Sequence, residues 1–329
     1  MNKNTGVKIL GTGSYLPKKV LTNEDLAKIV DTSDEWIITR TGMKERRVSE
    51  ADEPTSELAY HASLEALKAA NISASEIDLI LVATITPDML FPSTACFLQN
   101  KLGLKGIPAF DLSAACSGFV YAVSIAKAYI ESGMYKTVLL VGAEELTKFT
   151  DWTDRSTCVL FGDGAGAMVL TASDQSQDLL SVYLGADGSF WDLLFVPAGG
   201  TRTPTSLDTV NQKLHTIKML GREVFKAAVP KMVYAAEKAL ELAAKKLEDI
   251  KLFIPHQANM RILEAVARKL GISMERVFVN LHKTGNISSA TTITALDEAI
   301  KTGKLVKGDL AELIAFGGGF TWGAAVIRI

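Results

Sequence analysis

The sequence predicts an α/β fold built from two similar halves. Buried strands alternate with helices along the 329 residues, which is typical of α/β proteins. Short motifs of the first half also return in the same order in the second: K-L-G at 101–103 and 269–271, I-D-L-I-L-V at 77–82 and I-K-L-F-I-P at 250–255, F-G-D-G-A-G-A-M-V from Phe161 and F-G-G-G-F-T-W-G-A-A-V from Phe316. Such a duplication fixes the architecture. We place the halves at residues 1–178 and 179–329.

Composition excludes several classes of protein. The chain is 48% hydrophobic and 22% charged, which is typical of a globular protein, and its formal net charge of −2 gives no global basic field for nucleic acid or membrane. No apolar run is long enough to span a membrane, and the start M-N-K-N-T-G lacks the apolar core of a secretory signal. Three cysteines, an odd number, favour free thiols in a reducing compartment. We therefore expect a cytoplasmic protein that binds neither nucleic acid nor membranes.

Periodicity and capping residues predict the elements of the first half. A first strand is expected at 7–10, broken by Gly11, Gly13 and Pro17. The remaining expected elements follow in chain order: helix starts at 22–25 and 32–35, a helix at 55–70, a buried strand at 77–85, a helix from Phe91 to Gly103, a buried strand at 137–141, and a strand after the glycines at 162–166.

The stretch D-L-S-A-A-C-S-G-F-V at 111–120 predicts a strand, a tight turn and a buried helix, with Cys116 on the turn. Its small neighbours let other groups approach the sulfur closely. A helix N-terminus presents unpaired N–H groups, which favour thiolate over thiol. Buried cysteines often only fill space, so Cys116 becomes a candidate nucleophile only together with partners from elsewhere in the chain.

Two further stretches supply such partners. His256, in I-P-H-Q-A-N, follows a buried strand, and Asn286 lies in K-T-G-N-I-S-S-A. Gly133 follows Cys116 at the same spacing as Gly303 follows Asn286, so Cys116 and Asn286 occupy equivalent turns, which two like halves bring to a shared centre. A thiol, an imidazole and an amide suit acyl-thioester chemistry: the thiolate attacks a carbonyl and the other two donate to a developing oxyanion or enolate.

The order Cys, His, Asn also occurs in papain-like proteases, and the Cys–His separation falls in that family's range of about 130–150 residues. The C-G-S/A-C-W/Y signature of those enzymes is absent, however, and Cys116 lies deep in a duplicated chain. We therefore favour thioester chemistry over proteolysis.

The chain resembles the β-ketoacyl-acyl-carrier-protein synthase III family, the initiating condensing enzymes of bacterial type II fatty-acid synthesis. The resemblance implies a thiolase-like, five-layered αβαβα fold and a homodimer. The matching motifs run almost from end to end: G-T-G-S-Y-L-P, T-S-D-E-W-I-I-T-R-T-G, F-P-S-T-A-C, A-C-S-G-F, T-D-R, L-F-G-D-G-A-G-A, G-R-E-V-F-K, I-P-H-Q-A-N, G-N-I-S-S-A and F-G-G-G-F-T-W-G.

The resemblance also implies a reaction. Cys116 would take an acetyl or other short acyl group from coenzyme A, and His256 and Asn286 would promote decarboxylation of malonyl-acyl carrier protein. The resulting carbanion would attack the acyl-Cys116 thioester and give β-ketoacyl-acyl carrier protein. The backbone N–H groups of Cys116 and Gly318 would form the oxyanion hole. No metal and no cofactor beyond the coenzyme A thioester substrate is implied.

The same motifs imply binding residues. Trp36 and Arg155 would sandwich the adenine. Arg40 lies four residues after Trp36 on the same helix face, and a Trp packed under the Arg40 stem is at least as expected from sequence alone. Phe91 would cap the acyl pocket of the partner subunit. Solvated cations are common on helix faces, so the proposed basic patch for the acidic carrier protein is the weaker assignment. The remaining residues are Thr32, Arg40, Asn259 and Phe225 along the coenzyme A tunnel, and Lys226, Arg261, Arg268 and Lys269 in that patch.

The chain departs from the family pattern at a few positions. The family usually reads G-N-T-S-A-A-S where this chain has G-N-I-S-S-A-T, so Ile287 and Ser289 change the surroundings of Asn286, and Ala228 replaces a bulkier residue. Related condensing and acyl-transfer enzymes of secondary metabolism share the Cys-His-Asn set, and hydroxymethylglutaryl-coenzyme A synthase uses a Glu base, for which Glu144 and Glu145 are the candidates. An acyl-thioester hydrolase or a carrier-binding protein is the alternative from another class.

Overall fold

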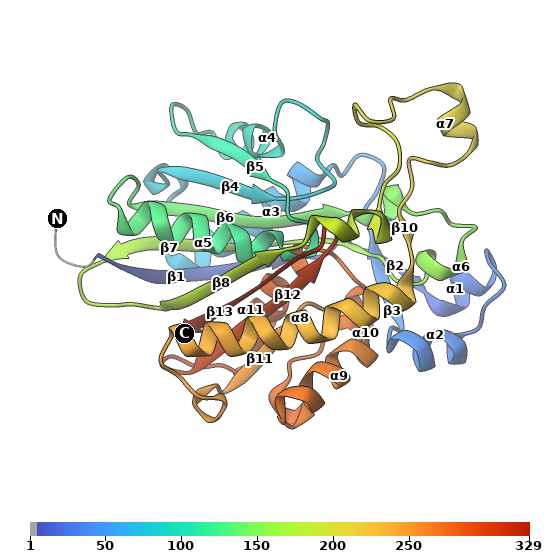
Figure 1. The fold of residues 1–329 in the computed structure, drawn as a ribbon. Coiled ribbons are helices and arrows are strands. Elements are labelled where there is room, and N and C mark those ends of the chain that lie inside the picture. The colour runs from blue at the N-terminus through green and yellow to red at the C-terminus, as the bar shows by residue number, and fades with distance from the viewer. Residues whose placement is uncertain (1–4) are drawn as a thin grey trace.

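The computed structural model describes residues 5–329. The sequence argument against a secretory signal used the start M-N-K-N-T-G, and the first four of these residues lie outside the described part of the chain. Two stacked β-sheets enclose a central pair of helices, and further helices cover the outer face of each sheet (Figure 1). This is the expected five-layered αβαβα arrangement, and the predicted fold class is confirmed. None of the described helices is both long and apolar enough to cross a membrane.

The first sheet has five strands in the order β1-β7-β6-β4-β5. Strands β4, β5 and β6 run parallel, whereas β1 and β7 add antiparallel pairs. Helix α3 packs on its outer face against β1, β6 and β7. The bounds are β1 Gly6–Tyr15, β4 Leu79–Ala83, β5 Ala109–Leu112, β6 Thr137–Glu145, β7 Asp163–Ser173, α3 Thr55–Ala70 and α4 Thr94–Lys101.

The second sheet has four strands in the order β11-β12-β13-β8, and helix α8 packs on its outer face. Helices α5 and α11 lie between the two sheets (Figure 1). The strands of each sheet come from only one of the two expected halves, and the boundary at residues 178 and 179 stays a prediction. The bounds are β8 Leu179–Ala186, β11 Leu252–Pro255, β12 Leu310–Gly317, β13 Thr321–Arg328, α5 Gly118–Glu131, α8 Gly221–Leu242, α9 Met260–Leu270 and α11 Ala290–Lys301.

Short elements connect this framework. The helices and strands are β2 Lys19–Thr22, α1 Asn23–Ala27, α2 Asp34–Thr41, β3 Glu45–Val48, α6 Arg155–Cys158, β9 Leu194–Phe195, α7 Leu207–Asn211, β10 Lys218–Met219 and α10 Leu281–Thr284. The 3₁₀ turns are η1 Ala74–Glu76, η2 Ala115–Ser117, η3 Leu146–Phe149, η4 Gly188–Leu193, η5 Leu247–Asp249 and η6 Met274–Arg276.

The expected break in the first strand is wrong. Helix α3 has the predicted bounds, but β1 continues through both glycines to Tyr15 and pairs with β7 over most of its length. The glycines serve helix–strand contact instead: a Cβ at Gly11 would lie 2.4 Å from Ala70 N, and a Cβ at Gly13 would lie 2.3 Å from Ala66 N. A bare backbone is therefore required because β1 touches the backbone of α3.

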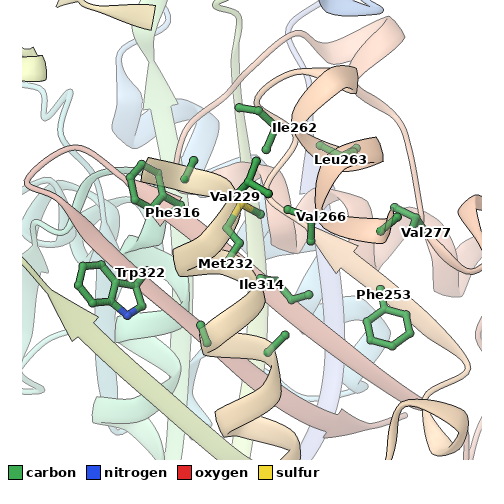
Figure 2. Close-up of a cluster of buried hydrophobic side chains, with 14 of the residues drawn as sticks. Val229, Met232, Phe253, Ile262, Leu263, Val266, Val277, Ile314, Phe316 and Trp322 are labelled. Atoms are coloured by element: carbon green, nitrogen blue, oxygen red, sulfur yellow. The ribbon is translucent and has the colours of Figure 1, made fainter. Parts of the chain in front are cut away.

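The largest apolar cluster lies between the outer face of the second sheet and the helices α8 and α9 that cover it (Figure 2). Met232 from α8 and Leu263 from α9 are buried in the same cluster as Phe253, which lies on β11. Burying a side chain of this size contributes about 1.5–3 kcal/mol. The cluster fixes α8 and α9 to the strands that end at the site described below.

We expect Gly13→Ala to lower the free energy of unfolding by about 1–3 kcal/mol, the usual cost of overpacking, because the new methyl group meets helix backbone that cannot turn aside. Gly200→Ala is the matched control, since nothing lies within 4 Å of a Cβ at Gly200. Urea denaturation followed by circular dichroism measures both. Equal stabilities for the two variants would contradict the close packing of β1 on α3.

Candidate active site

Cys116 lies on η2, between the end of β5 and the start of α5. Ala115 before it has φ of 47°, a left-handed conformation that is strained for a residue with a side chain. The second half fixes this turn: Ser117 Oγ donates to Thr321 O over 3.1 Å, and Thr321 Oγ1 donates to Ala114 O over 2.9 Å. A Cβ at Gly317 would lie 2.5 Å from Cys116 N, so only glycine fits there.

His256 follows directly after β11 and is 3% exposed. Its backbone N–H donates to Ile314 O over 2.7 Å, which continues the parallel pairing of β11 with β12. Nδ1 of its ring lies 2.6 Å from Thr291 Oγ1 on α11. The ring is therefore oriented by the central layer of helices.

Asn286 lies on the turn between α10 and α11. Its backbone pairs with the segment before β7, through Asn286 N to Leu160 O at 2.8 Å and Gly162 N to Asn286 O at 3.0 Å. The side-chain oxygen accepts the backbone N–H of Ser288 at 2.9 Å. Because a backbone N–H can only donate, Oδ1 occupies that side and the amide Nδ2 is free to donate elsewhere.

The three groups line one cavity of about 690 Å³. The cavity thus joins side chains that lie far apart in the sequence, on the turns of both halves. Of the other predicted residues, Trp36, Arg40, Phe225, Lys226, Asn259 and Arg261 also line it.

Cys116, His256 and Asn286, which line the buried part of the cavity, are all uncharged at neutral pH. Burial raises the pKa of the Cys116 thiol to about 12 and lowers the pKa of His256 to about 3. The expectation that the helix N-terminus favours thiolate is therefore not borne out, because desolvation of the buried thiol outweighs the hydrogen bonds that lower its pKa. At neutral pH the pair consists of a thiol and a neutral imidazole, and a nucleophile forms only when the thiol proton is removed.

The adenine site that the family resemblance implies, between Trp36 and Arg155, is too narrow in this structure to hold a base. Cζ of Arg155 lies 4.9 Å from the Trp36 ring centroid, and Cζ of Arg40 lies 5.8 Å from it. A planar base between Trp36 and Arg155 needs roughly 7 Å, two contact distances. Arg155, which donates to Asp31 O at 2.8 Å, would have to move aside. The nearby Thr32 Oγ1 is buried and has no hydrogen-bond partner among residues 5–329.

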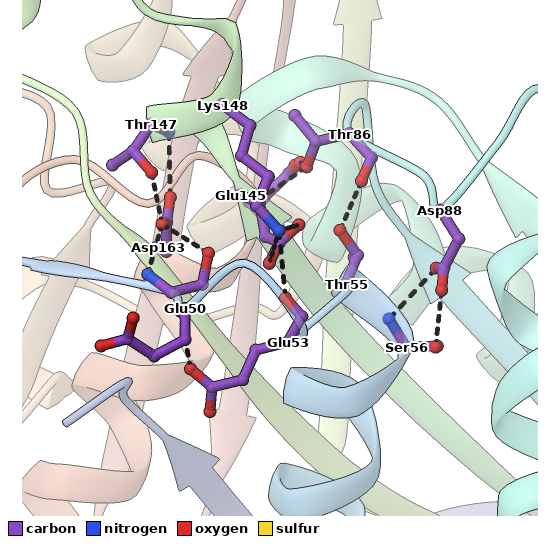
Figure 3. Close-up of polar contacts among 12 residues, drawn as sticks. Glu50, Glu53, Thr55, Ser56, Thr86, Asp88, Glu145, Thr147, Lys148 and Asp163 are labelled. Atoms are coloured by element: carbon purple, nitrogen blue, oxygen red, sulfur yellow. Dashed lines mark hydrogen bonds and ion pairs between the residues drawn. The ribbon is translucent and has the colours of Figure 1, made fainter. Parts of the chain in front are cut away.

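Phe91 does not line this cavity, and its side chain is 85% exposed beside the 84% exposed Leu90. The loop that carries it is fixed by polar contacts (Figure 3): Thr55 Oγ1 donates to Thr86 O at 2.5 Å and Ser56 Oγ donates to Asp88 at 2.6 Å. A fixed loop that presents two apolar side chains to solvent has the form of an interaction surface.

The remaining predicted residues are spread around the cavity. Gly318 is half-buried next to Gly317, which does line it. Arg268 and Lys269 are exposed in the last turn of α9 and do not reach it. Lys226 pairs with Glu223 at 3.0 Å on the exposed face of α8.

The departures at Ile287 and Ser289 fit the structure. Ile287 is fully buried, and its Cδ1 would lie 3.3 Å from a Cβ at Gly164. Ser289 Oγ lies 2.8 Å from Ala83 O and 2.8 Å from Glu144 Oε1. Glu144 Oε2 accepts from Thr86 Oγ1 at 2.7 Å, so this buried carboxyl joins the segment after β4 to the start of α11 and does not line the cavity.

Sequence reasoning missed several residues that position the site. Gln257 is buried; its Nε2 donates to Pro255 O and Phe278 O, and its Oε1 accepts from Asn280 N and, more weakly, Leu281 N. Its place directly after His256 was the available signal. Thr291 was missed because its contact with His256 depends on which turn of α11 faces β11. Arg222 lines the cavity mouth and lay inside the quoted G-R-E-V-F-K motif.

Comparisons with known proteins agree with the motifs. Residues 110–188 match the family described as 3-Oxoacyl-[acyl-carrier-protein (ACP)] synthase III, and residues 240–329 match its C-terminal family. A Beta-ketoacyl-[acyl-carrier-protein] synthase III of Caldanaerobacter subterraneus subsp. tengcongensis is 53% identical over 320 residues, 97% of this chain and 97% of that protein.

Solved structures give the same result. The 3-oxoacyl-[acyl-carrier-protein] synthase III from Aquifex aeolicus VF5 has a TM-score of 0.91 and 53% identity, and the match covers 98% of this chain and 100% of that chain. The priming beta-ketosynthase from the R1128 polyketide biosynthetic pathway has a TM-score of 0.92 and 36% identity, with 100% and 98% covered.

We expect Gln257→Leu to lower the free energy of unfolding by about 2–4 kcal/mol, because it leaves buried backbone groups on both sides without a partner. Gln212→Ala is the control, since Gln212 is exposed at the end of α7 and we expect a change within about 0.5 kcal/mol. Chemical denaturation of both variants is the measurement. A Gln257→Leu protein as stable as the control would show that these hydrogen bonds do not stabilise the loop.

Proposed function

The chain belongs to the 3-oxoacyl-[acyl-carrier-protein] synthase III family, and we propose that Cys116, His256 and Asn286 carry its reaction. The activity of the family is that of an acyltransferase that condenses an acyl-coenzyme A with malonyl-acyl carrier protein and so initiates fatty-acid synthesis. The observation that supports the residue assignment is the single cavity that these three side chains line. This membership also excludes the papain-like protease.

In the proposed reaction Cys116 accepts the acyl group from coenzyme A, with acetyl as the simplest primer. Malonyl-acyl carrier protein then loses carbon dioxide, which generates a carbanion without a base. His256 and Asn286 donate hydrogen bonds to the enolate oxygen, and the carbanion attacks the acyl-Cys116 thioester. An amide suits the third position because, unlike a carboxylate, it adds no negative charge beside an enolate. The N–H groups of Cys116 and Gly318 form the oxyanion hole.

Residues in and around the cavity supply the binding surfaces of this proposal. Thr32, Trp36, Arg40, Arg155, Phe225 and Asn259 bind coenzyme A, and Lys226, Arg261, Arg268 and Lys269 meet the acidic carrier protein. Their exposed cations support this, because a local patch attracts an acidic partner even when net charge is near zero. We assign the exposed Phe91 to the acyl pocket of a second subunit, and hence propose a homodimer.

The product decides between this reaction and its rivals. The protein is incubated with acetyl-coenzyme A and malonyl-acyl carrier protein, and the carrier is analysed by intact-mass spectrometry, with Cys116→Ala as the control. We expect acetylated Cys116 and a ketoacyl carrier from the unaltered protein only. Free acid alone would instead identify a hydrolase, and a Cys116 that never acylates would indicate a carrier-binding role.

We expect Asn286→Asp to keep acylation of Cys116 and to lose most of the condensation. The substitution replaces a donor by a negative charge next to the enolate, and loss of one oxyanion donor typically costs about 2.7–4 kcal/mol, or roughly 100- to 1,000-fold in rate. Acylation is read by intact mass and condensation by the rate of ketoacyl-carrier formation. Full condensation by this variant would contradict the role of Asn286.

A further inference from the structure

One hydroxyl group makes two short contacts behind the imidazole of His256. Thr291 Oγ1 lies 2.6 Å from Nδ1 of His256 and 2.8 Å from the backbone oxygen of Ser288. All of these residues are buried. A hydroxyl has one proton, and a carbonyl oxygen can only accept. Thr291 Oγ1 donates its proton to Ser288 O, so the short contact with the ring is a hydrogen bond only if Nδ1 carries the proton.

We infer that Thr291 is a positioning residue that fixes His256 in the Nδ1–H tautomer, so that Nε2 carries a lone pair in the resting site. Nδ1 is turned to α11, and Nε2 makes no hydrogen bond within residues 5–329. The neutral state of the ring agrees with this, because burial lowers the pKa of His256 to about 3. An imidazole in this state accepts a proton through Nε2 and has none to donate there.

This inference rests on the proposed function for its consequence, which is a fixed route for one proton. During acylation the S–H bond of Cys116 breaks, its proton moves to Nε2, and its electron pair forms the bond to the acyl carbon. The bond from that carbon to the coenzyme A sulfur breaks, and coenzyme A leaves as a thiolate that takes a proton from water. A thiol is a weak nucleophile, so its proton has to leave as the bond to the acyl carbon forms, and Nε2 is the acceptor assigned to it.

The same proton then serves the condensation. Protonated Nε2 and the Asn286 amide both donate hydrogen bonds to the thioester oxygen of the malonyl group. The malonyl group then loses carbon dioxide, and the electron pair of the broken carbon–carbon bond forms the enolate. The enolate carbon attacks the acyl carbon, the Cys116 sulfur leaves with its electron pair, and that thiolate takes the proton back from Nε2. Thr291 thus sets the starting state from which His256 acts first as acceptor and then as donor.

The chain offers a conservative variant and a matched control. Thr291→Ser keeps a hydroxyl in place, whereas Thr291→Val replaces it by a methyl group of similar size. Thr292→Val is the control, because Thr292 is the next buried threonine of α11 and its hydroxyl has no partner among the described residues. The full-length protein is labelled with ¹⁵N-histidine, and a long-range ¹H–¹⁵N spectrum of the resting enzyme reports which ring nitrogen is protonated. The His256 signals are assigned by their absence in His256→Ala.

We expect protonated Nδ1 and unprotonated Nε2 in the unaltered protein, in Thr291→Ser and in Thr292→Val. In Thr291→Val the ratio of the two tautomers should move toward Nε2–H by roughly 3- to 10-fold, the effect of one lost hydrogen bond. Single-turnover acylation of Cys116 by acetyl-coenzyme A, read by intact mass, should slow by a similar factor and recover in Thr291→Ser.

Protonated Nε2 in the unaltered resting protein would overturn the inference, as would a Thr291→Val tautomer ratio equal to that of Thr292→Val. If Thr291→Val does not fold, Thr291→Ala takes its place in the same comparison, and protonated Nε2 in the unaltered protein still overturns the inference. Failure of the proposed function is a separate result: no ketoacyl carrier forms from acetyl-coenzyme A and malonyl-acyl carrier protein, whatever tautomer the spectrum shows.

Discussion

The site depends on one constraint: the backbones of the two halves touch directly, at glycines that have no side chain. A Cβ at Gly317 would lie 2.5 Å from Cys116 N, and one at Gly162 would lie 2.3 Å from Thr284 O. A Cβ at Gly142 would lie 2.9 Å from Ser289 O. These glycines let the turn of Cys116 approach β12 and let the turn of Asn286 approach β6 and β7. The glycine-rich motifs therefore bring the turn of Cys116, after β5, and the turn of Asn286, before α11, close together, and a side chain at any of these positions would separate them.

Glu144 makes the same connection with hydrogen bonds. Its Oε2 accepts from Ile85 N and Thr86 Oγ1 just beyond the end of β4, and its Oε1 lies 2.8 Å from Ser289 Oγ at the start of α11. Burial raises the pKa of this carboxyl, while the hydrogen bonds from Thr86 and Ser289 act in the opposite direction. A buried carboxyl with this many donors is satisfied, so Glu144 fixes the loop toward Phe91 and the turn of Asn286 relative to each other. Glu144 does not line the cavity, which is where a base would have to lie.

The features predicted from sequence are those set by local pattern. Helix α3 has an apolar stripe and begins and ends where the letters indicate, and the spacing from Cys116 to Gly133 and from Asn286 to Gly303 predicted the equivalence of two turns that do line one cavity. Features set by tertiary contact were missed or wrong. The strand β1 continues through Gly11 because α3 packs there, and burial keeps Cys116 as a thiol, which no count of neighbouring residues reveals. The direction of Thr291 depends on how α11 faces β11, and the sequence contains no signal for that.

The distribution of charge along the cavity follows from these contacts and bears on the chemistry. The cationic side chains that line it, Arg40, Arg222, Lys226 and Arg261, are all exposed, whereas Cys116, His256 and Asn286 are buried and uncharged. In the proposed reaction the cations attract acidic carriers and phosphates to the opening. A malonyl carboxylate that passes beyond them leaves these side chains behind, and the positive charge that acylation places on His256 is directed through Nε2 at the thioester oxygen rather than at the carboxylate, whose unpaired charge is costly there. Loss of carbon dioxide moves that charge onto the thioester oxygen, which is where donors are available. The arrangement thus favours the charge of the product of decarboxylation over the charge of its reactant, which is what catalysis of this step requires.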